Sequence, residues 1–169
     1  LEIFNLLRAY KYIYSTRIQK RLTINLIKKI HSMVMKNISQ MAGFYRNESW
    51  AIFNKEGSVV YLPPAHFKVP GLMNDLISIY EKSIYHPFVR SAITQFLFEK
   101  IHPFADGNGR VGRLISTYIL QSQGYGFRGL VPVEEIVDNK RHDYYETLEP
   151  SKDVTLFVEF MLESFIEQA

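Results

Sequence analysis

Apolar residues recur at helical spacing along most of this chain, and the recurrence predicts an all-α fold. Within each stretch they follow the i, i+3, i+4, i+7 spacing of one helix face. The stretches with this pattern are residues 3–14, 23–35, 89–97, 111–119 and 154–165, with weaker stripes over 72–85 and 133–148. No internal repeat or linker-like change of composition separates them, so we expect one domain over residues 1–169.

One segment breaks the helical pattern and predicts a β-hairpin. Residues 49–53 and 58–62 are short, rich in β-forming side chains and joined through residues 54–57, which end in glycine. Pro63 and Pro64 then end the second strand. Because a lone hairpin is only marginally stable by itself, we expect it to lie on the helices with a strand edge left open.

Composition narrows the class of protein. The hydrophobic share, 47%, is that of a soluble globular protein. No apolar run approaches the ~20 residues that span a bilayer, and no signal-peptide cleavage site follows residues 1–14. The chain has no cysteine, which excludes disulfides and thiolate metal sites. We therefore expect a cytoplasmic protein without membrane contact, and the leucine at position 1 leads us to expect that upstream residues have been removed.

Charge is spread unevenly. Residues 1–40 hold eight lysines and arginines against one acid, whereas residues 133–169 hold ten acids against three bases. A basic end can bind nucleic acid. Here the basic residues are spread over two predicted helices and no nucleic-acid motif accompanies them, so a solvated helical surface is the better interpretation.

The candidate catalytic and binding residues lie in residues 101–113. This segment reads Ile-His-Pro-Phe-Ala-Asp-Gly-Asn-Gly-Arg-Val-Gly-Arg. They lie between the two most regular stripes, which predicts a loop leading into a helix that begins near Gly109. A helix start presents unpaired N–H groups and the positive end of the dipole, and glycines let the backbone approach a ligand closely. Together these features favour a phosphate cradle. Arg110 and Arg113 share a helix face beside it and can bind further phosphates.

Two more residues complete the pattern. Asp106 is a hard oxygen ligand suited to Mg²⁺ on a nucleotide, and His102 is the natural general base at neutral pH. A simple turn is disfavoured because the flanks are helical. The segment lacks the glycine and the glutamate that a calcium loop needs, and it lacks the Gly-Lys-Ser/Thr of a Walker A loop. The remaining histidines, interpreted as structural or solvated, are His31, His66, His86 and His142.

The stretch from His102 to Arg113 resembles the Fic family signature, His-Pro-Phe-x-Asp/Glu-Gly-Asn-Gly-Arg-x-x-Arg, with every fixed position matched. The likeness extends to the lead-in at 98–101, to Gly43-Phe44-Tyr45-Arg46 and Tyr61-Leu62-Pro63-Pro64, and to residues 2–10, 69–73 and 141–148. It implies the family's all-helical bundle, with a small β-hairpin flap beside the active-site loop.

The resemblance implies a protein adenylyltransferase that moves AMP from ATP onto a Ser, Thr or Tyr hydroxyl of a target protein. His102 would be the base, and Asp106 would hold Mg²⁺ or Mn²⁺. The implied phosphate-binding residues are Gly107, Asn108, Gly109, Arg110 and Arg113. Tyr144 and Tyr145 are possible adenine contacts. The flap at Val59, Val60 and Tyr61 would clamp the target by adding a strand to its open edge.

Alternatives stay open. Doc-type relatives transfer phosphate and carry a larger basic residue at the position of Gly109, so the glycine here favours AMP. Others transfer UMP or phosphocholine, and a non-enzymatic regulatory module is the alternative from another class.

Many relatives carry an inhibitory helix, Ser/Thr-x-x-x-Glu-Gly/Asn, whose glutamate pairs with the second motif arginine. The nearest match, Thr155 to Glu159, is followed by Phe160, so we expect that helix to come from upstream residues or another chain, leaving Arg113 unpaired here.

Overall fold

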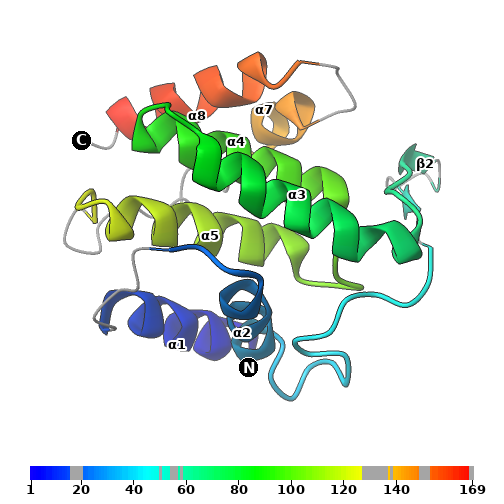
Figure 1. Ribbon diagram of the computed structural model, residues 1–169. Coiled ribbons are helices and arrows are strands. Elements are labelled where there is room, and N and C mark those ends of the chain that lie inside the picture. Colours follow the sequence, from blue (N-terminus) through cyan, green and yellow to red (C-terminus); the bar gives the residue numbers. More distant parts are fainter. Residues whose placement is uncertain are drawn as a thin grey trace.

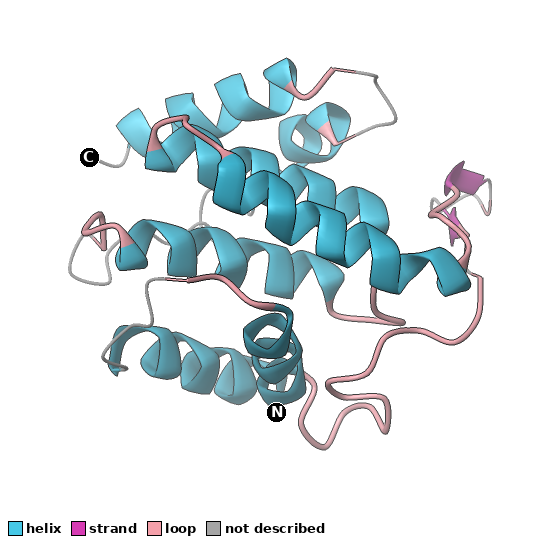
Figure 2. Ribbon diagram, viewed as in Figure 1, coloured by secondary structure: helices cyan, strands magenta, loops and turns pink. Residues whose placement is uncertain are grey.

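The computed structural model describes residues 1–15, 21–49, 51–53, 57, 59–126, 137, 139–148 and 153–167. In these residues the fold is a bundle of helices with one pair of short strands at its side (Figures 1 and 2). The helices are α1 (Glu2–Ser15), α2 (Ile24–Val34), α3 (Val69–Lys82), α4 (Pro87–Ile101), α5 (Asn108–Ser122), α7 (Arg141–Thr147) and α8 (Thr155–Glu167), with a 3₁₀ turn η1 at His66–Lys68. The predicted all-helical fold is confirmed.

The helices α4 and α5 form the centre of the bundle. They make the most extensive contact of any two elements, with α1 and α2 on one side of the pair and α7 and α8 on the other (Figure 1). Both carry buried residues on more than one face, as expected of helices enclosed by others. The apolar core therefore has two parts, one among α1 to α5 and one where α7 and α8 cover α4. The loop between α4 and α5 lies within this frame.

Most helix boundaries agree with the stripes. α2 starts after Thr23, whose hydroxyl accepts a hydrogen bond from the Leu26 N–H at 3.2 Å. α3 begins before the predicted residue 72, because Pro70 fits the first turn of a helix. The predicted helix over 133–148 is described only as α7, since residues 127–136 and 138 lie outside the described residues.

The stripe predicted for the first helix is only partly buried. Ile3 and Leu7 are 77% and 54% exposed. The face that packs carries Asn5, Ala9 and Ile13 instead. Asn5 accounts for the difference, since its Nδ2 donates to the backbone carbonyls of Val34 at 3.1 Å and Lys36 at 2.7 Å. These bonds hold the face of Asn5, Ala9 and Ile13 against the end of α2.

Two short strands pair antiparallel at the place where the hairpin was expected. β1 (Ile52–Phe53) and β2 (Val59–Tyr61) are shorter than the predicted 49–53 and 58–62, and the register shifts between Ile52 and Phe53. The Tyr61 hydroxyl donates to the Lys100 carbonyl at 2.5 Å, which attaches β2 to the last turn of α4. The strands thus lie near the end of α4 that leads into the motif loop.

In the described parts of the chain, no helix combines the length and apolar character that a bilayer crossing needs.

A buried polar chain joins α4, α5 and α7. The Ser116 hydroxyl donates to Gln95 Oε1 at 2.6 Å, and Gln95 Nε2 donates to the Tyr144 hydroxyl at 2.9 Å. Tyr144 is 1% exposed and packs among aromatic rings of α8. The chain of bonds therefore fixes how α7 sits on the central helices.

Replacement of Tyr144 by Phe should lower the free energy of unfolding by about 1–3 kcal/mol, because the buried Gln95 amide loses its acceptor while the ring volume is kept. Tyr145→Phe, at a ring that is 51% exposed, is the matched control and should change stability by less than about 0.5 kcal/mol. Urea unfolding of both variants measures this. Equal stabilities would mean that the bond contributes nothing to the docking of α7.

Candidate active site

The motif forms the short loop from α4 to α5 as predicted, and α5 begins at Asn108, one residue before the expected start. Gly107, the residue before the helix, has a φ of 80°, in the left-handed region that favours glycine. A Cβ there would lie 2.8 Å from Sδ of Met35, the residue after α2, so that side chain would have to shift. The backbone conformation of the turn into α5 therefore favours glycine at this position.

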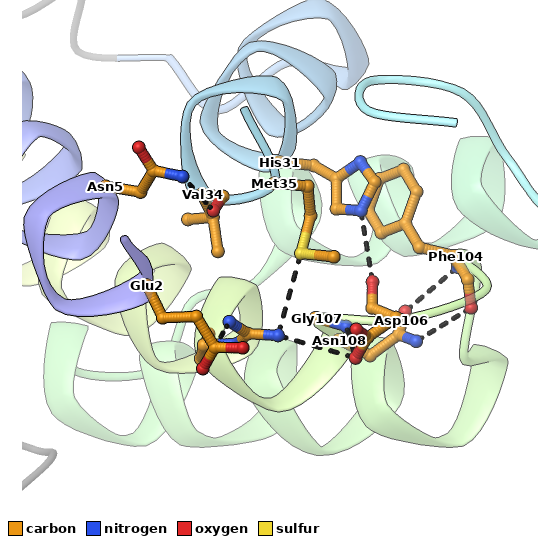
Figure 3. A network of polar contacts seen from close by, with 10 residues as sticks. Glu2, Asn5, His31, Val34, Met35, Phe104, Asp106, Gly107 and Asn108 are labelled. Atoms are coloured by element: carbon orange, nitrogen blue, oxygen red, sulfur yellow. Dashed lines mark hydrogen bonds and ion pairs between the residues drawn. The ribbon is translucent and has the colours of Figure 1, made fainter. Parts of the chain in front are cut away.

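Asn108 holds the loop closed from inside. Its Oδ1 accepts the Phe104 N–H at 2.9 Å and its Nδ2 donates to the Phe104 carbonyl at 2.8 Å (Figure 3). Asn108 is 2% exposed and Phe104 is fully buried. Asn108 thus sets the shape of the loop through a buried amide that is bonded to the Phe104 backbone.

His31 supports the same loop from α2. Its ring stacks on Phe104 with centroids 3.7 Å apart. Its Nδ1 accepts the Gly43 N–H at 2.8 Å, so the proton lies on Nε2, which is 3.1 Å from the Asp106 carbonyl. Burial lowers the pKa of His31 to about 4, which keeps the ring neutral in this role. The structural interpretation of His31 is consistent with these contacts.

His102 lies at the C-terminal end of α4 in a left-handed conformation, with φ 48° and ψ 61°. This conformation is uncommon for a residue with a Cβ and turns the chain out of the helix. Its ring hydrogen-bonds to the Glu99 backbone carbonyl. Burial, with a smaller contribution from Arg46, lowers the pKa of His102 to about 4. The imidazole is therefore neutral at pH 7, with one nitrogen held by a carbonyl and the other able to accept a proton.

Arg46 is the main residue that sequence reasoning missed as a part of the site. It is 3% exposed, and its guanidinium donates to four backbone carbonyls. The donors reach His102 O at 2.7 Å and Glu48 O at 3.0 Å, as well as the carbonyls of Pro64 and Ile101. Arg46 therefore joins three segments around the end of α4. Its place in Gly-Phe-Tyr-Arg was noticed, but no pattern in the sequence says that an arginine will bind carbonyls.

Arg110 and Arg113 lie one turn apart at the start of α5, where the first N–H groups of the helix have no carbonyl in the preceding turn. Arg110 is close to two carboxylates, Glu2 Oε2 at 3.3 Å and Asp106 Oδ1 at 3.4 Å (Figure 3). Glu2, from α1, was not predicted. Arg113 lies over Gly109, where a Cβ would be 3.3 Å from its Nη1. The two guanidinium groups and the helix end favour an anion at the same place.

Asp106 points outward, with its side chain 65% exposed. Its Oδ1 accepts the Gly107 N–H at 2.5 Å and faces Arg110. A single exposed carboxylate beside a phosphate cradle fits Mg²⁺, which on nucleotides takes one or two carboxylates with phosphate oxygens and water. Among the described residues there is no group of three or more acidic or imidazole side chains that would form a metal cage by itself.

The remaining predicted residues separate into buried and exposed ones. Tyr144 is a core residue with its hydroxyl bonded to Gln95, so the interpretation as an adenine contact was wrong for its ring. Tyr145 next to it is half exposed. Val59 is 56% exposed on β2, and Tyr61 lines an apolar groove between β2, α3 and α4. The side chain of Val60 lies outside the described residues.

Glu159, in the nearest match to an inhibitory helix, is exposed on α8 and is consistent with a solvated face. Arg113, in contrast, was expected to be unpaired, and this expectation was wrong. The charge of Glu99, in the last turn of α4, interacts with the charge of Arg113. No sequence signal identified Glu99, since it stands outside the fixed motif positions.

The fold and the motif have close counterparts among known proteins. The profile of the Fic/DOC family matches residues 21–120. A Fic family protein from Desulfovibrio desulfuricans G20 superposes with a TM-score of 0.87 and 35% identity, over 99% of this chain and 51% of that one. A Fic domain containing signaling protein from Bacteroides thetaiotaomicron VPI-5482 superposes with a TM-score of 0.79 at 21% identity, over 99% and 69%.

Two curated relatives are named protein adenylyltransferase Fic. The one from Nematostella vectensis is 34% identical over 168 residues, 95% of this chain and 36% of that protein. The one from Aedes aegypti is 30% identical over 169 residues, 95% of this chain and 31% of that protein. This chain therefore spans about a third of the length of these relatives. With the motif, the helical frame and these matches in agreement, the chain belongs to the Fic/DOC family.

Proposed function

We propose that this chain is the core of a protein adenylyltransferase, which transfers AMP from ATP to a hydroxyl side chain of a target protein. The observation that carries the proposal is the position of a neutral imidazole, His102, one short loop away from a helix start with two arginines. The names of the relatives that match along 95% of the chain support it.

The phosphates of ATP would lie on the first turn of α5. The N–H groups of Asn108 and Gly109, at the start of α5, would bind them together with the Gly107 N–H once Asp106 Oδ1 releases it, and the arginines would supply positive charge for the outer phosphates. Such positioning and charge stabilisation supply most of the catalysis in phosphoryl transfer. Binding of the polyanion would displace Glu2 and Asp106 from Arg110, because exposed carboxylates hold it only weakly.

The chemical step needs one proton acceptor. The target hydroxyl forms a bond to the α-phosphorus while its proton moves to the ring nitrogen of His102, and the bond from that phosphorus to the bridging oxygen breaks to release pyrophosphate. The other ring nitrogen stays on the Glu99 carbonyl and keeps the ring oriented. The negative charge of bound ATP would raise the low pKa of His102 and make it a better base. Mg²⁺ held by Asp106 would supply charge neutralisation for the departing pyrophosphate.

The target would dock beside the strands. β1 and β2 are the two strands of the sheet in the described residues, so each has an edge without a strand partner there. Val59, Leu62 and Phe67 are 56%, 70% and 71% exposed in this region, and the groove at Tyr61 lies next to Ile101. An extended segment added to a strand edge would bring one hydroxyl side chain near His102 without much selection for sequence.

Gly109 favours AMP over phosphate as the transferred group. A Cβ at this position would already press on Arg113, and a long basic side chain would enter the space of the outer phosphates. UMP and phosphocholine transfer remain alternatives because no described contact reads the base. Labelled nucleotides incubated with the protein and a cell lysate test the choice, and protein-bound label from any donor other than ATP would contradict the assignment to AMP transfer.

An inhibitory helix from elsewhere would act by bringing a carboxylate to Arg113.

Replacement of His102 by Ala should lower the transfer rate by about 10²–10⁴-fold, because the proton acceptor is lost, while ATP affinity stays within about twofold. His102→Asn should do the same, and asparagine tolerates the left-handed backbone that alanine disfavours. His86→Ala, at the opposite end of α4, is the control. Label transfer and calorimetric ATP binding measure the two effects. Unchanged transfer in both His102 variants would remove this residue from the mechanism.

The transfer reaction should require Mg²⁺ or Mn²⁺ and stop with excess EDTA. Asp106→Asn keeps an oxygen for the Gly107 N–H but loses the charge, so it should need about tenfold more Mg²⁺ for half-maximal rate. Glu163→Gln, on the exposed face of α8, should behave as the parent. A magnesium titration of the initial rate distinguishes them, and full activity in EDTA would contradict the role of Asp106.

A further inference from the structure

The end of α4 is joined to the strand pair, β1 and β2, by hydrogen bonds that take no part in the reaction described above. A helix leaves the carbonyl groups of its last turn without partners inside the helix. Here the Lys100 carbonyl accepts the Tyr61 hydroxyl of β2 at 2.5 Å, and the Ile101 carbonyl lies 3.5 Å from Arg46 Nη2. The strand pair lies at the same end of the bundle as the motif loop (Figure 1).

Arg46 forms hydrogen bonds in two directions. Toward the motif, its backbone N–H donates to the Pro103 carbonyl at 2.9 Å and its Nε donates to the His102 carbonyl at 2.7 Å. Toward the strands, Nη1 donates to the Glu48 carbonyl at 3.0 Å and Nη2 donates to the Pro64 carbonyl. Glu48 precedes β1 and Pro64 follows β2, so one guanidinium holds the chain on both sides of the strand pair. Arg46 therefore connects the strands to the backbone of the proposed base.

The shape of the guanidinium matters for this connection. Arg46 is 3% exposed, and its donors meet backbone carbonyls from three separate segments. Hydrogen bonds from a charged donor are stronger than those from a neutral one. The donors of arginine form a rigid fork, whereas those of lysine come from a single nitrogen on a flexible stem. An arginine can thus keep several carbonyls at fixed positions relative to one another.

Tyr61 is the second attachment. Besides its hydroxyl bond to the Lys100 carbonyl, its ring centroid lies 5.2 Å from Lys100 Nζ. Burial raises the pKa of Tyr61, so the hydroxyl keeps its proton and remains a donor at neutral pH. β2 is therefore held to α4 by a side chain of its own, in addition to the bonds that Arg46 makes outside the strands.

We propose that Arg46 and Tyr61 are positioning residues that hold β1 and β2 in a fixed place relative to His102, and so determine whether a docked target hydroxyl reaches the proton acceptor. The proposal rests on the proposed function, in which the target docks on a strand edge and His102 takes its proton. The physical reason is the short reach of proton transfer, which needs the two heavy atoms about 2.6–3.2 Å apart. A misplacement of about 1 Å can lower a rate about 10²-fold.

Loss of either attachment should affect transfer but not the binding of ATP. The bonds of Arg46 and Tyr61 to the end of α4 go to the carbonyls of residues 100–103, whereas ATP would lie on the N–H groups at the start of α5. The half-saturating ATP concentration should therefore stay within about twofold, while the transfer rate at saturating ATP falls. Residues that only stabilised the fold would leave the rate per folded molecule unchanged.

Two variants test the attachments separately. Arg46→Lys keeps the charge but loses the fork, so transfer should fall about 10–100-fold. Tyr61→Phe keeps the ring but loses the hydroxyl, so transfer should fall about three- to tenfold, and this variant decides the question if Arg46→Lys does not fold. Arg8→Lys on α1 and Tyr85→Phe after α3, both at exposed positions, are the matched controls. Transfer is measured on the lysate protein that the parent labels most strongly, over a range of ATP concentrations, with thermal unfolding of each variant.

A distance measurement tests the attachments without any target. The sequence has no cysteine, so Val59→Cys on β2 and Glu163→Cys on α8, both at exposed positions, accept one spin label each. The helix α8 packs against α4 and serves as the fixed reference. Pulsed electron paramagnetic resonance gives the distribution of distances between the labels. It should be narrow in the parent background and wider when Arg46→Lys or Tyr61→Phe is added.

A wider distribution together with slower transfer at parental ATP dependence supports the proposal. Folded variants with an unchanged distribution overturn it, and so do variants with a wider distribution but parental transfer. A fall in ATP affinity as large as the fall in transfer overturns it too. A parent that transfers no label from ATP overturns the proposed function and this proposal with it, whereas the three results before it leave the proposed function standing.

Discussion

Two helix ends of opposite partial charge meet at one short loop, and the rest of the site depends on this meeting. α4 ends at Ile101 with carbonyl groups of negative partial charge, and α5 begins at Asn108 with N–H groups of positive partial charge. Arg46 satisfies the first end by binding the carbonyls of Ile101 and His102 from inside the protein. The second end carries glycines and arginines, so it favours a negative ligand. His102 lies between the two, with its carbonyl on Arg46 and its ring on the Glu99 carbonyl.

Burial then sets the charge of this region. It lowers the pKa of His31 and His102 to about 4 and raises that of Glu99 to about 7, so all three groups move toward their neutral forms. Arginines cannot respond in this way, since they stay protonated in proteins. The two neutral histidines add no positive charge, so the positive charge of the region comes from its arginines, while partial protonation of Glu99 removes negative charge. The low pKa alone does not identify the base, because His31 shares it but has both ring nitrogens occupied.

The sequence predicted what depends on local spacing. Apolar stripes located the helices, and the glycines with the acid, base and arginines located the loop and the start of α5. It did not predict contacts between distant segments. Arg46 acts through backbone carbonyls, which every residue has, and Asn5 turns its own face of α1 inward in the same way. Tyr144 was misread because a tyrosine near a site gives no local sign that its hydroxyl will bind Gln95 in the core.

The glycines after the loop have different physical reasons. Gly107 needs its left-handed backbone, whereas Gly109 and Gly112 lie within α5, where any residue could adopt the backbone. Their small size matters because charged side chains lie above them, Arg113 over Gly109 and Glu99 over Gly112. Gly112 stands at a variable position of the motif, so its glycine is a partner of Glu99 rather than of the phosphates. The motif therefore extends backward into α4, since the side chain that occupies the space over Gly112 comes from the helix before the loop.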